Sequence, residues 1–116
     1  MINSYIKGIS HFVPDDIITN DDLAKLMDTS DEWIKSRTGI QQRHTVGTSQ
    51  LGPTDLATKA AEKVLKKCNV DKNEIDFVVF ATSTPDYFVP GAGSIFQEKL
   101  GLKNIGVLDI RQGCSG

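Results

Sequence analysis

This sequence of 116 residues has little cysteine, few aromatic side chains and no strong excess of charge. It holds two cysteines, one tryptophan and 7% aromatic residues, and its formal net charge is −2 with a pI near 5.6. The small net charge gives no electrostatic basis for binding nucleic acid or an anionic membrane. No apolar run is long enough to span a bilayer, and the first residues lack the apolar stretch of a signal peptide. We therefore expect a cytoplasmic protein.

The two cysteines also exclude several kinds of site. Cys68 and Cys114 form neither a metal-ligand spacing nor a Cys-x-x-Cys pair, so we expect no metal site, and the absence of a secretion signal argues against a disulfide. Cys68 falls on the apolar stripe of an expected helix, where a thiol behaves as a small hydrophobic group. Cys114 differs, because it follows an apolar run inside a Gly-Cys-Ser-Gly turn. A thiol at such a junction is well placed to act as an acyl-accepting nucleophile.

Hydrophobic patterning predicts strands alternating with helices. Strands are expected at Ser4–Val13, Ile75–Thr82 and Ile105–Ile110. The last two are so apolar that we expect both of their faces to be covered. Helices are expected at Asn20–Met27, from a Thr29 cap to Arg37 with a stop at Gly39, from Thr54 or Asp55 to Cys68, and at Gly91–Leu100. The segment Gln41–His44 is too short and polar to assign, and Thr45–Pro53 is expected to be an exposed loop.

This order of elements predicts an α/β layered domain with mainly parallel strands. The visible helices could cover only part of the two apolar strands. We therefore expect an incomplete domain that is poorly soluble or partly unfolded by itself.

One expected helix carries a second group of candidate residues. Thr29 and Glu32 have the spacing of a capping box at its start. Trp33 and Arg37 are four residues apart, so their side chains would share one face. Tryptophan offers a flat surface for an adenine ring, and arginine a forked set of donors for phosphate. The alternative is a packing tryptophan beside a helix-terminal arginine, and periodicity alone favours that alternative.

Five stretches form an ordered pattern: Asp28–Ile34, Arg37–Ile40, Arg43–His44, Thr82–Asp86 and Cys114–Gly116. Together they resemble the opening of the β-ketoacyl-acyl-carrier-protein synthase III family. The resemblance implies a thiolase-like layered α/β/α fold, with residues 1–116 as the N-terminal part of a domain that ends at the nucleophile. It also implies a homodimer.

The resemblance further implies an acyltransferase of fatty-acid initiation. Acyl-coenzyme A would acylate Cys114, and decarboxylative condensation with malonyl-acyl-carrier-protein would follow. The matching tryptophan and arginine of the family contact coenzyme A, which assigns that role to Trp33 and Arg37, with Thr29 close by. Coenzyme A is then a substrate carrier, and no permanently bound cofactor is expected. The family's histidine and asparagine partners would lie beyond Gly116, so we expect the 116 residues alone to be inactive.

The chemistry of Cys114 can also be argued without the family. A thiolate attacks a thioester, and an α-helix starting at Cys114 would direct its free N–H groups at the sulfur. The same N–H groups could hold an oxyanion. His11 and His44 have no visible relay partner, so we predict structural roles for both.

Three functions stay open from the residues. The first is the decarboxylative condensing enzyme. The second keeps an acylated cysteine but uses another acceptor, either a hydroxyl or amine or a second acyl-coenzyme A. The third is a non-catalytic subunit of the same fold that pairs with an active partner.

Overall fold

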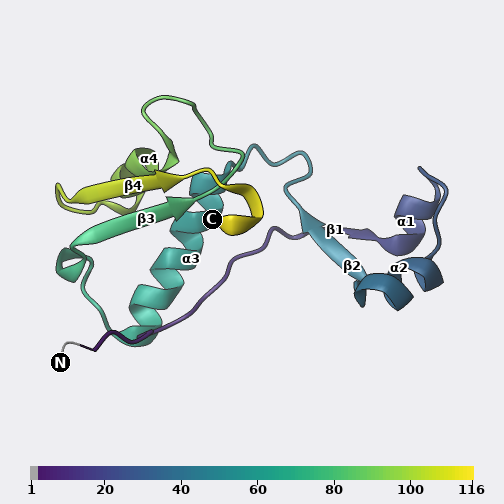
Figure 1. Cartoon of the computed structure of the whole chain (residues 1–116), viewed down its shortest axis with the longest axis horizontal. Helices are drawn as coiled ribbons and strands as arrows, with labels where there is room; N and C mark the ends of the chain where they lie inside the picture. Colours follow the sequence, from purple (N-terminus) through teal and green to yellow (C-terminus); the bar gives the residue numbers. More distant parts are fainter. Residues whose placement is uncertain (1–2) are drawn as a thin grey trace. The chain divides into compact units, whose positions relative to one another are not determined.

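A computed structural model describes residues 3–116, which form two compact units (Figure 1). We call residues 3–12 and 51–116 the α/β unit, and Val13–Gln50 the small unit. No helix of the described residues is both long enough and apolar enough to cross a bilayer.

The α/β unit is built on two parallel strands, β3 (Phe77–Ala81) and β4 (Gly106–Ile110). Their register pairs Phe77 with Gly106 and Ala81 with Ile110, so both carboxyl ends lie at one edge of the sheet. Helices α3 (Pro53–Cys68) and α4 (Ala92–Leu100) pack against each other, and α4 also contacts both strands (Figure 1). Short 3₁₀ turns, η1 (Lys72–Glu74) and η2 (Gly113–Ser115), complete the unit. The parallel α/β arrangement confirms the fold class predicted from the sequence.

The core lies on the side of the sheet that faces α4. Val78, Phe80 and Ala92 are buried there, and the rings of Phe80 and Phe96 are 5.5 Å apart between centroids. The opposite face of the sheet is open: Phe77 and Val79 are more than half exposed, and Leu108 nearly so. This confirms the prediction that the visible helices cover only part of the two strands, because the core of the unit lies on one face of the sheet and the other face is left exposed.

Local signals set the helix ends in the α/β unit. Helix α3 begins one or two residues earlier than predicted, with Pro53 in its first turn and Gly52 as its N-cap. Proline suits this position because its missing N–H would have no partner there. Helix α4 ends at Gly101, whose φ of 66° lies in the left-handed region that glycine adopts without strain. This end was predicted correctly.

The predicted first strand, Ser4–Val13, is wrong for this structure. The segment is extended, but it pairs with no strand of the described chain. Side chains of α3 hold it instead: Lys63 and Lys67 donate to the carbonyls of His11 and Ile9, and the Cys68 thiol donates to the carbonyl of Lys7. Alternating β-prone residues favour a strand only where a partner edge is available.

The small unit contains two short helices and an antiparallel strand pair. Strand β1 (Asp16–Thr19) pairs with β2 (Gln42–Thr45), a segment that the sequence left unassigned. Helix α1 (Asn20–Ala24) is shorter than predicted, and Thr19 rather than Asn20 caps it. Helix α2 (Asp31–Thr38) ends at Gly39 as predicted, with φ of 73°. Its cap is Ser30, whose hydroxyl accepts the Trp33 N–H at 3.1 Å, so the prediction of a Thr29 cap is wrong.

Candidate functional site

Cys114 lies where the parallel strands end. The ladder continues one bond past β3 and β4, because the Thr82 N–H donates to the Ile110 carbonyl at 3.0 Å. Two residues later the chain enters η2, which begins at Gly113 with φ of 57°. This left-handed conformation strains any residue with a side chain, so glycine is the residue that permits the turn. The turn leaves Cys114 exposed.

Backbone bonds close the turn around the cysteine. The N–H groups of Ser115 and Gly116 donate to the carbonyls of Gln112 and Gly113, each at 3.2 Å. These bonds make a single 3₁₀ turn, and the prediction of a helix starting at Cys114 stays a prediction, because it concerns residues beyond Gly116. Because both N–H groups already have partners, neither is free to stabilise an oxyanion in this conformation.

An arginine fixes the approach to this turn from the neighbouring loop. Arg111 donates to the Phe88 carbonyl at 3.1 Å, and its guanidinium lies 4.8 Å from the centroid of the Phe88 ring. The loop after β3 is thereby tied to the segment between β4 and Cys114. Tyr87, Phe88 and Val89 in this loop are largely exposed.

Asp86, in the same loop, also anchors α3. Its carboxylate accepts the N–H of Thr54 at 3.2 Å in the first turn of that helix. A carboxylate is favourable at a helix N-terminus because it meets unpaired N–H groups and the positive end of the dipole. The sequence placed Asp86 in a family motif but gave no sign of this contact. The residue positions the loop that follows β3.

Trp33 and Arg37 lie together on α2 in the small unit, and Thr29 lines a pocket with Trp33 that Arg37 does not line. The Arg37 guanidinium lies 5.6 Å from the centroid of the Trp33 ring, which confirms that the two side chains share a face of α2. Trp33 is 56% exposed, so it is not part of a core formed by residues 3–116. The exposed ring offers an aromatic surface stacked with a cation.

A pocket opens beside this tryptophan. It has a volume of about 350 Å³ and is lined by Asp28, Thr29, Ser30 and Trp33. The Thr29 hydroxyl is buried and has no hydrogen-bond partner. A buried polar atom without a partner is costly, so it marks a place where a ligand or water would bind. Because Ser30 performs the capping, the Thr29 hydroxyl is left available.

A polar hub supports α2 and was missed by sequence reasoning. Asn20 is 1% exposed, and its amide donates to Asp31 at 2.9 Å and to the Ile40 carbonyl at 2.8 Å. Arg43 donates to the Asn20 side-chain oxygen at 2.7 Å. The hub fixes both ends of α2. In the sequence, Arg43 could be noticed only as part of a family motif. Asn20 is followed by two aspartates, and no sequence pattern there predicts that its side chain is buried.

Neither histidine is part of the candidate site. The His44 ring donates from Nδ1 to the Pro14 carbonyl at 2.6 Å, and His11 accepts a Lys63 bond through its backbone. The structure supports the structural role predicted for His44. Among residues 3–116 no group of three or more histidine, cysteine or acidic side chains is arranged to hold a metal ion.

The fold defines the class of protein. The chain has a thiolase-like α/β fold, and it superimposes on the crystal structure of 3-oxoacyl-[acyl-carrier-protein] synthase III from Aquifex aeolicus with a TM-score of 0.82 and 37% identity. That match covers 89% of this chain and 33% of the solved one. The priming β-ketosynthase of the R1128 polyketide pathway also matches, with a TM-score of 0.82 and 28% identity over 90% of this chain and 31% of that structure.

Sequence comparison gives the family. The chain is 44% identical over 115 residues to β-ketoacyl-[acyl-carrier-protein] synthase III 2 of Bacteroides thetaiotaomicron, covering 99% of this chain and 34% of the relative. It is 46% identical over 116 residues to the synthase III of Ehrlichia canis, covering 36% of that protein. No family model matches. The chain is therefore homologous over its whole length to the N-terminal third of the β-ketoacyl-acyl-carrier-protein synthase III family, and it spans about a third of the length of these relatives.

Proposed function

We propose that this chain is the N-terminal part of a thiolase-like condensing enzyme of fatty-acid initiation, in which Cys114 carries the acyl group. The observation that supports this most directly is an exposed thiol on the turn where β3 and β4 end, in a chain homologous to synthase III proteins. The proposal includes acyl-coenzyme A and malonyl-acyl-carrier-protein as substrates. It also includes a cytoplasmic homodimer without a resident cofactor.

The proposed reaction has two steps at one sulfur. The Cys114 thiolate attacks the thioester carbonyl of acyl-coenzyme A, the bond from the carbonyl carbon to the coenzyme A sulfur breaks, and the coenzyme A thiolate takes up the proton lost from Cys114. The malonyl group then loses carbon dioxide, its carbon attacks the acyl carbonyl, and Cys114 is released as the thiolate. The product is a 3-oxoacyl chain on the carrier protein.

In this proposal, the residues of this sequence position the Cys114 sulfur but do not supply every group that the reaction needs. Gly113 gives the turn its left-handed backbone and holds Cys114 exposed. The N–H groups of Ser115 and Gly116 are bonded within the turn. We propose that further residues, outside this sequence, donate to the oxyanion and move the proton.

The second part of the proposal is that Thr29, Trp33 and Arg37 bind coenzyme A. The adenine ring would stack on the exposed Trp33 ring, and Arg37 would pair with phosphate. The unpartnered Thr29 hydroxyl beside the pocket would gain a hydrogen bond from the ligand. These three side chains are proposed as binding residues and not as catalytic ones.

The acylation is tested by incubating the full protein with acetyl-coenzyme A and recording its intact mass. We expect one acetyl adduct on the wild type and none on Cys114→Ser. Cys68→Ser is the matched control, because Cys68 is partly buried and donates to the Lys7 carbonyl. An adduct that survives Cys114→Ser, or none with any of several acyl donors, would contradict the proposal. Carbon dioxide release from labelled malonyl-carrier protein then separates condensation from transfer to another acceptor.

Coenzyme A binding can be followed through the single tryptophan. We expect titration with coenzyme A to quench Trp33 fluorescence. Arg37→Gln should raise the Kd about tenfold or more, since a hydrogen bond to a charged group contributes about 1.5–3 kcal/mol. Lys35→Gln is the control, because it removes one positive charge from the same helix as Arg37, at a residue whose ammonium donates to the exposed side of Asp31. Equal affinities of the Arg37 and Lys35 variants would exclude Arg37 as a phosphate ligand.

A further inference from the structure

The loop that joins β3 to α4, residues 82–91, is held at both ends by β4. At its start, the Thr82 N–H donates to the Ile110 carbonyl at 3.0 Å. Just after its end, the Gly93 N–H donates to a carboxylate oxygen of Asp109 at 2.9 Å. Both ends of the loop are therefore attached to the last two residues of one strand.

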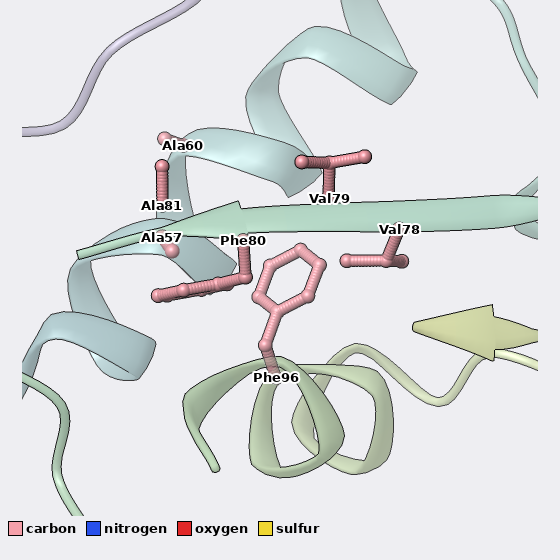
Figure 2. A pocket seen from close by; sticks show the side chains of 7 residues that line it. All are labelled: Ala57, Ala60, Val78, Val79, Phe80, Ala81 and Phe96. Atoms are coloured by element: carbon pink, nitrogen blue, oxygen red, sulfur yellow. The ribbon is translucent and has the colours of Figure 1, made fainter. Parts of the chain in front are cut away.

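The apolar core holds the same two ends of the loop. Figure 2 shows the ring of Phe96, from α4, facing the ring of Phe80 on β3, while the Val79 side chain points to the opposite face of the strand. These three residues contribute to the lining of a pocket of about 300 Å³. Because α4 packs against β3, the part of this connection that is not fixed by the core is residues 82–91.

Arg111 adds an attachment at the middle of this loop. Its guanidinium donates to the Phe88 carbonyl at 3.1 Å and lies 4.8 Å from the centroid of the Phe88 ring. Phe88 is 81% exposed, so packing within the chain does not fix it. A planar guanidinium with several donors can make both contacts at once. Three consecutive residues, Asp109, Ile110 and Arg111, thus hold the end, the start and the middle of the loop.

The same arginine attaches the segment that carries the nucleophile. Within residues 3–116, the Arg111 side chain makes the hydrogen bond that joins residues 111–116 to the rest of the chain, and the other two bonds of this segment, from the Ser115 and Gly116 N–H groups, are internal. A single 3₁₀ turn closed by two bonds has little stability of its own. The position of Cys114 on this turn therefore depends on the attachment of Arg111 to the loop.

We propose that Arg111 is a positioning residue, which holds the turn of Cys114 in place for acylation by attaching it to the 82–91 loop. This inference rests on the proposed function. The attacking sulfur must come within about 3–3.5 Å of the thioester carbonyl carbon, and a misplacement of about 1 Å can slow a reaction about 10²-fold. Arg111 takes no part in the bond changes and acts through Phe88 and the turn.

The rate of acylation tests this role in the full protein. We expect Arg111→Gln to slow acetylation of Cys114 by acetyl-coenzyme A about tenfold, as a displacement of less than about 1 Å would. Arg111→Lys should recover part of the rate, because it keeps a cation beside the Phe88 ring. The Kd of coenzyme A, followed by Trp33 fluorescence, should change by less than about twofold, which separates positioning of the sulfur from binding of the substrate.

Lys103→Gln is the matched control. Lys103 also donates to a backbone carbonyl, that of Asn73 at 2.8 Å, and to Asp76 at 3.3 Å. These contacts lie at the other end of the sheet, before β3 and β4 begin. The control should therefore acylate at the wild-type rate. Equal rates for Arg111→Gln and Lys103→Gln overturn the proposal, and so does a slower rate in Arg111→Gln that is explained by a weaker Kd.

Hydrogen exchange distinguishes failure of this inference from failure of the proposed function. If the wild type gains no acetyl group, the proposed function fails, and the attachment is still measured at the amides of Ser115 and Gly116. Both amides should exchange faster in Arg111→Gln than in Lys103→Gln, and equal exchange overturns the inference whether or not the protein is active. If Arg111→Gln does not fold, NMR of the wild type decides, because absence of contacts between the Arg111 side chain and the Phe88 ring overturns it.

Discussion

The two units of this molecule are stabilised by different kinds of interaction. In the α/β unit the core is apolar, with Val78, Phe80 and Ala92 at the centre and Phe96 packed against them, and Thr54 is the buried polar residue found among its described residues. In the small unit Ile34 is the buried apolar residue, and the most buried side chain is the amide of Asn20. The α/β unit is therefore stabilised mainly by burial of apolar side chains, and the small unit mainly by buried hydrogen bonds.

This difference determines how the stability of each unit responds to substitution of a buried side chain. Trimming an apolar side chain removes contacts in proportion to the volume lost. Removing one member of a buried polar hub leaves the remaining members without partners, and each then bears a desolvation cost. The proposed coenzyme A residues lie in the polar unit and Cys114 lies in the apolar one, so the two parts of the proposed function have different sensitivities.

The largest expected effect is from Phe80→Ala in the α/β unit. The ring packs on Phe96 and fills the space between β3 and α4, so its loss should lower the free energy of unfolding by about 3 kcal/mol. Val79→Ala on the open face of the same strand should cost less than about 1 kcal/mol, because Val79 is 58% exposed. Urea denaturation followed by circular dichroism measures both. Equal losses would mean that the open face of β3 is covered in solution.

Asn20→Ala in the small unit should have the next largest effect. It leaves Asp31, the Ile40 carbonyl and Arg43 each without a bond that the amide supplies, at a cost of about 2 kcal/mol. Urea denaturation followed by Trp33 fluorescence reports this loss within the same unit. Asn20→Asp should not restore stability, because a carboxylate cannot donate to Asp31 or to a carbonyl. Full stability of either variant would show that the hub is not what orders the unit.

The sequence predicted the α/β unit well because its signals are local. Apolar spacing located α3 and α4, and continuous apolar runs located β3 and β4. The small unit depends on pairing between distant polar segments. Strand β2 contains Gln42, Arg43, His44 and Thr45, which show no apolar alternation, and its order comes from β1 and Asn20. Nothing within a short window carries that information.

The candidate site divides in the same way. Cys114 was predicted from a local pattern of strand, glycine and turn, and the structure places it exposed on such a turn. The shared face of Trp33 and Arg37 followed from helical spacing. Helical spacing could not decide whether Thr29 or Ser30 caps the helix, because either hydroxyl suits the N-cap position. The two possibilities differ by one residue in where the helix starts. That shift is what leaves the Thr29 hydroxyl without a partner.

The smallest effect concerns an ion pair that joins α3 to α4 in the apolar unit. Lys99 donates to Asp55 at 2.6 Å and to the buried Thr54 hydroxyl at 2.9 Å, and Asp55 also accepts the Gly52 N–H. Lys99, followed by the Gly52 N–H, lowers the pKa of the Asp55 carboxyl. We expect Lys99→Met to cost about 1 kcal/mol at neutral pH, because the pair is only partly exposed.

The pH dependence of that cost tests its electrostatic origin. Since the pKa of Asp55 is lower in the folded state than in the unfolded state, the stabilisation is complete above the unfolded value, near pH 4, and is lost as the pH falls through the folded value. The difference in unfolding free energy between wild type and Lys99→Met should therefore shrink as the pH falls below about 4. Lys35→Met, which breaks the more exposed Lys35–Asp31 pair on α2, should cost less than Lys99→Met. If the difference in unfolding free energy between wild type and Lys99→Met stays constant on acidification, the contribution of Lys99 comes from packing of its aliphatic stem and not from its charge. The contact between α3 and α4 would then be stabilised by apolar packing even at this ion pair.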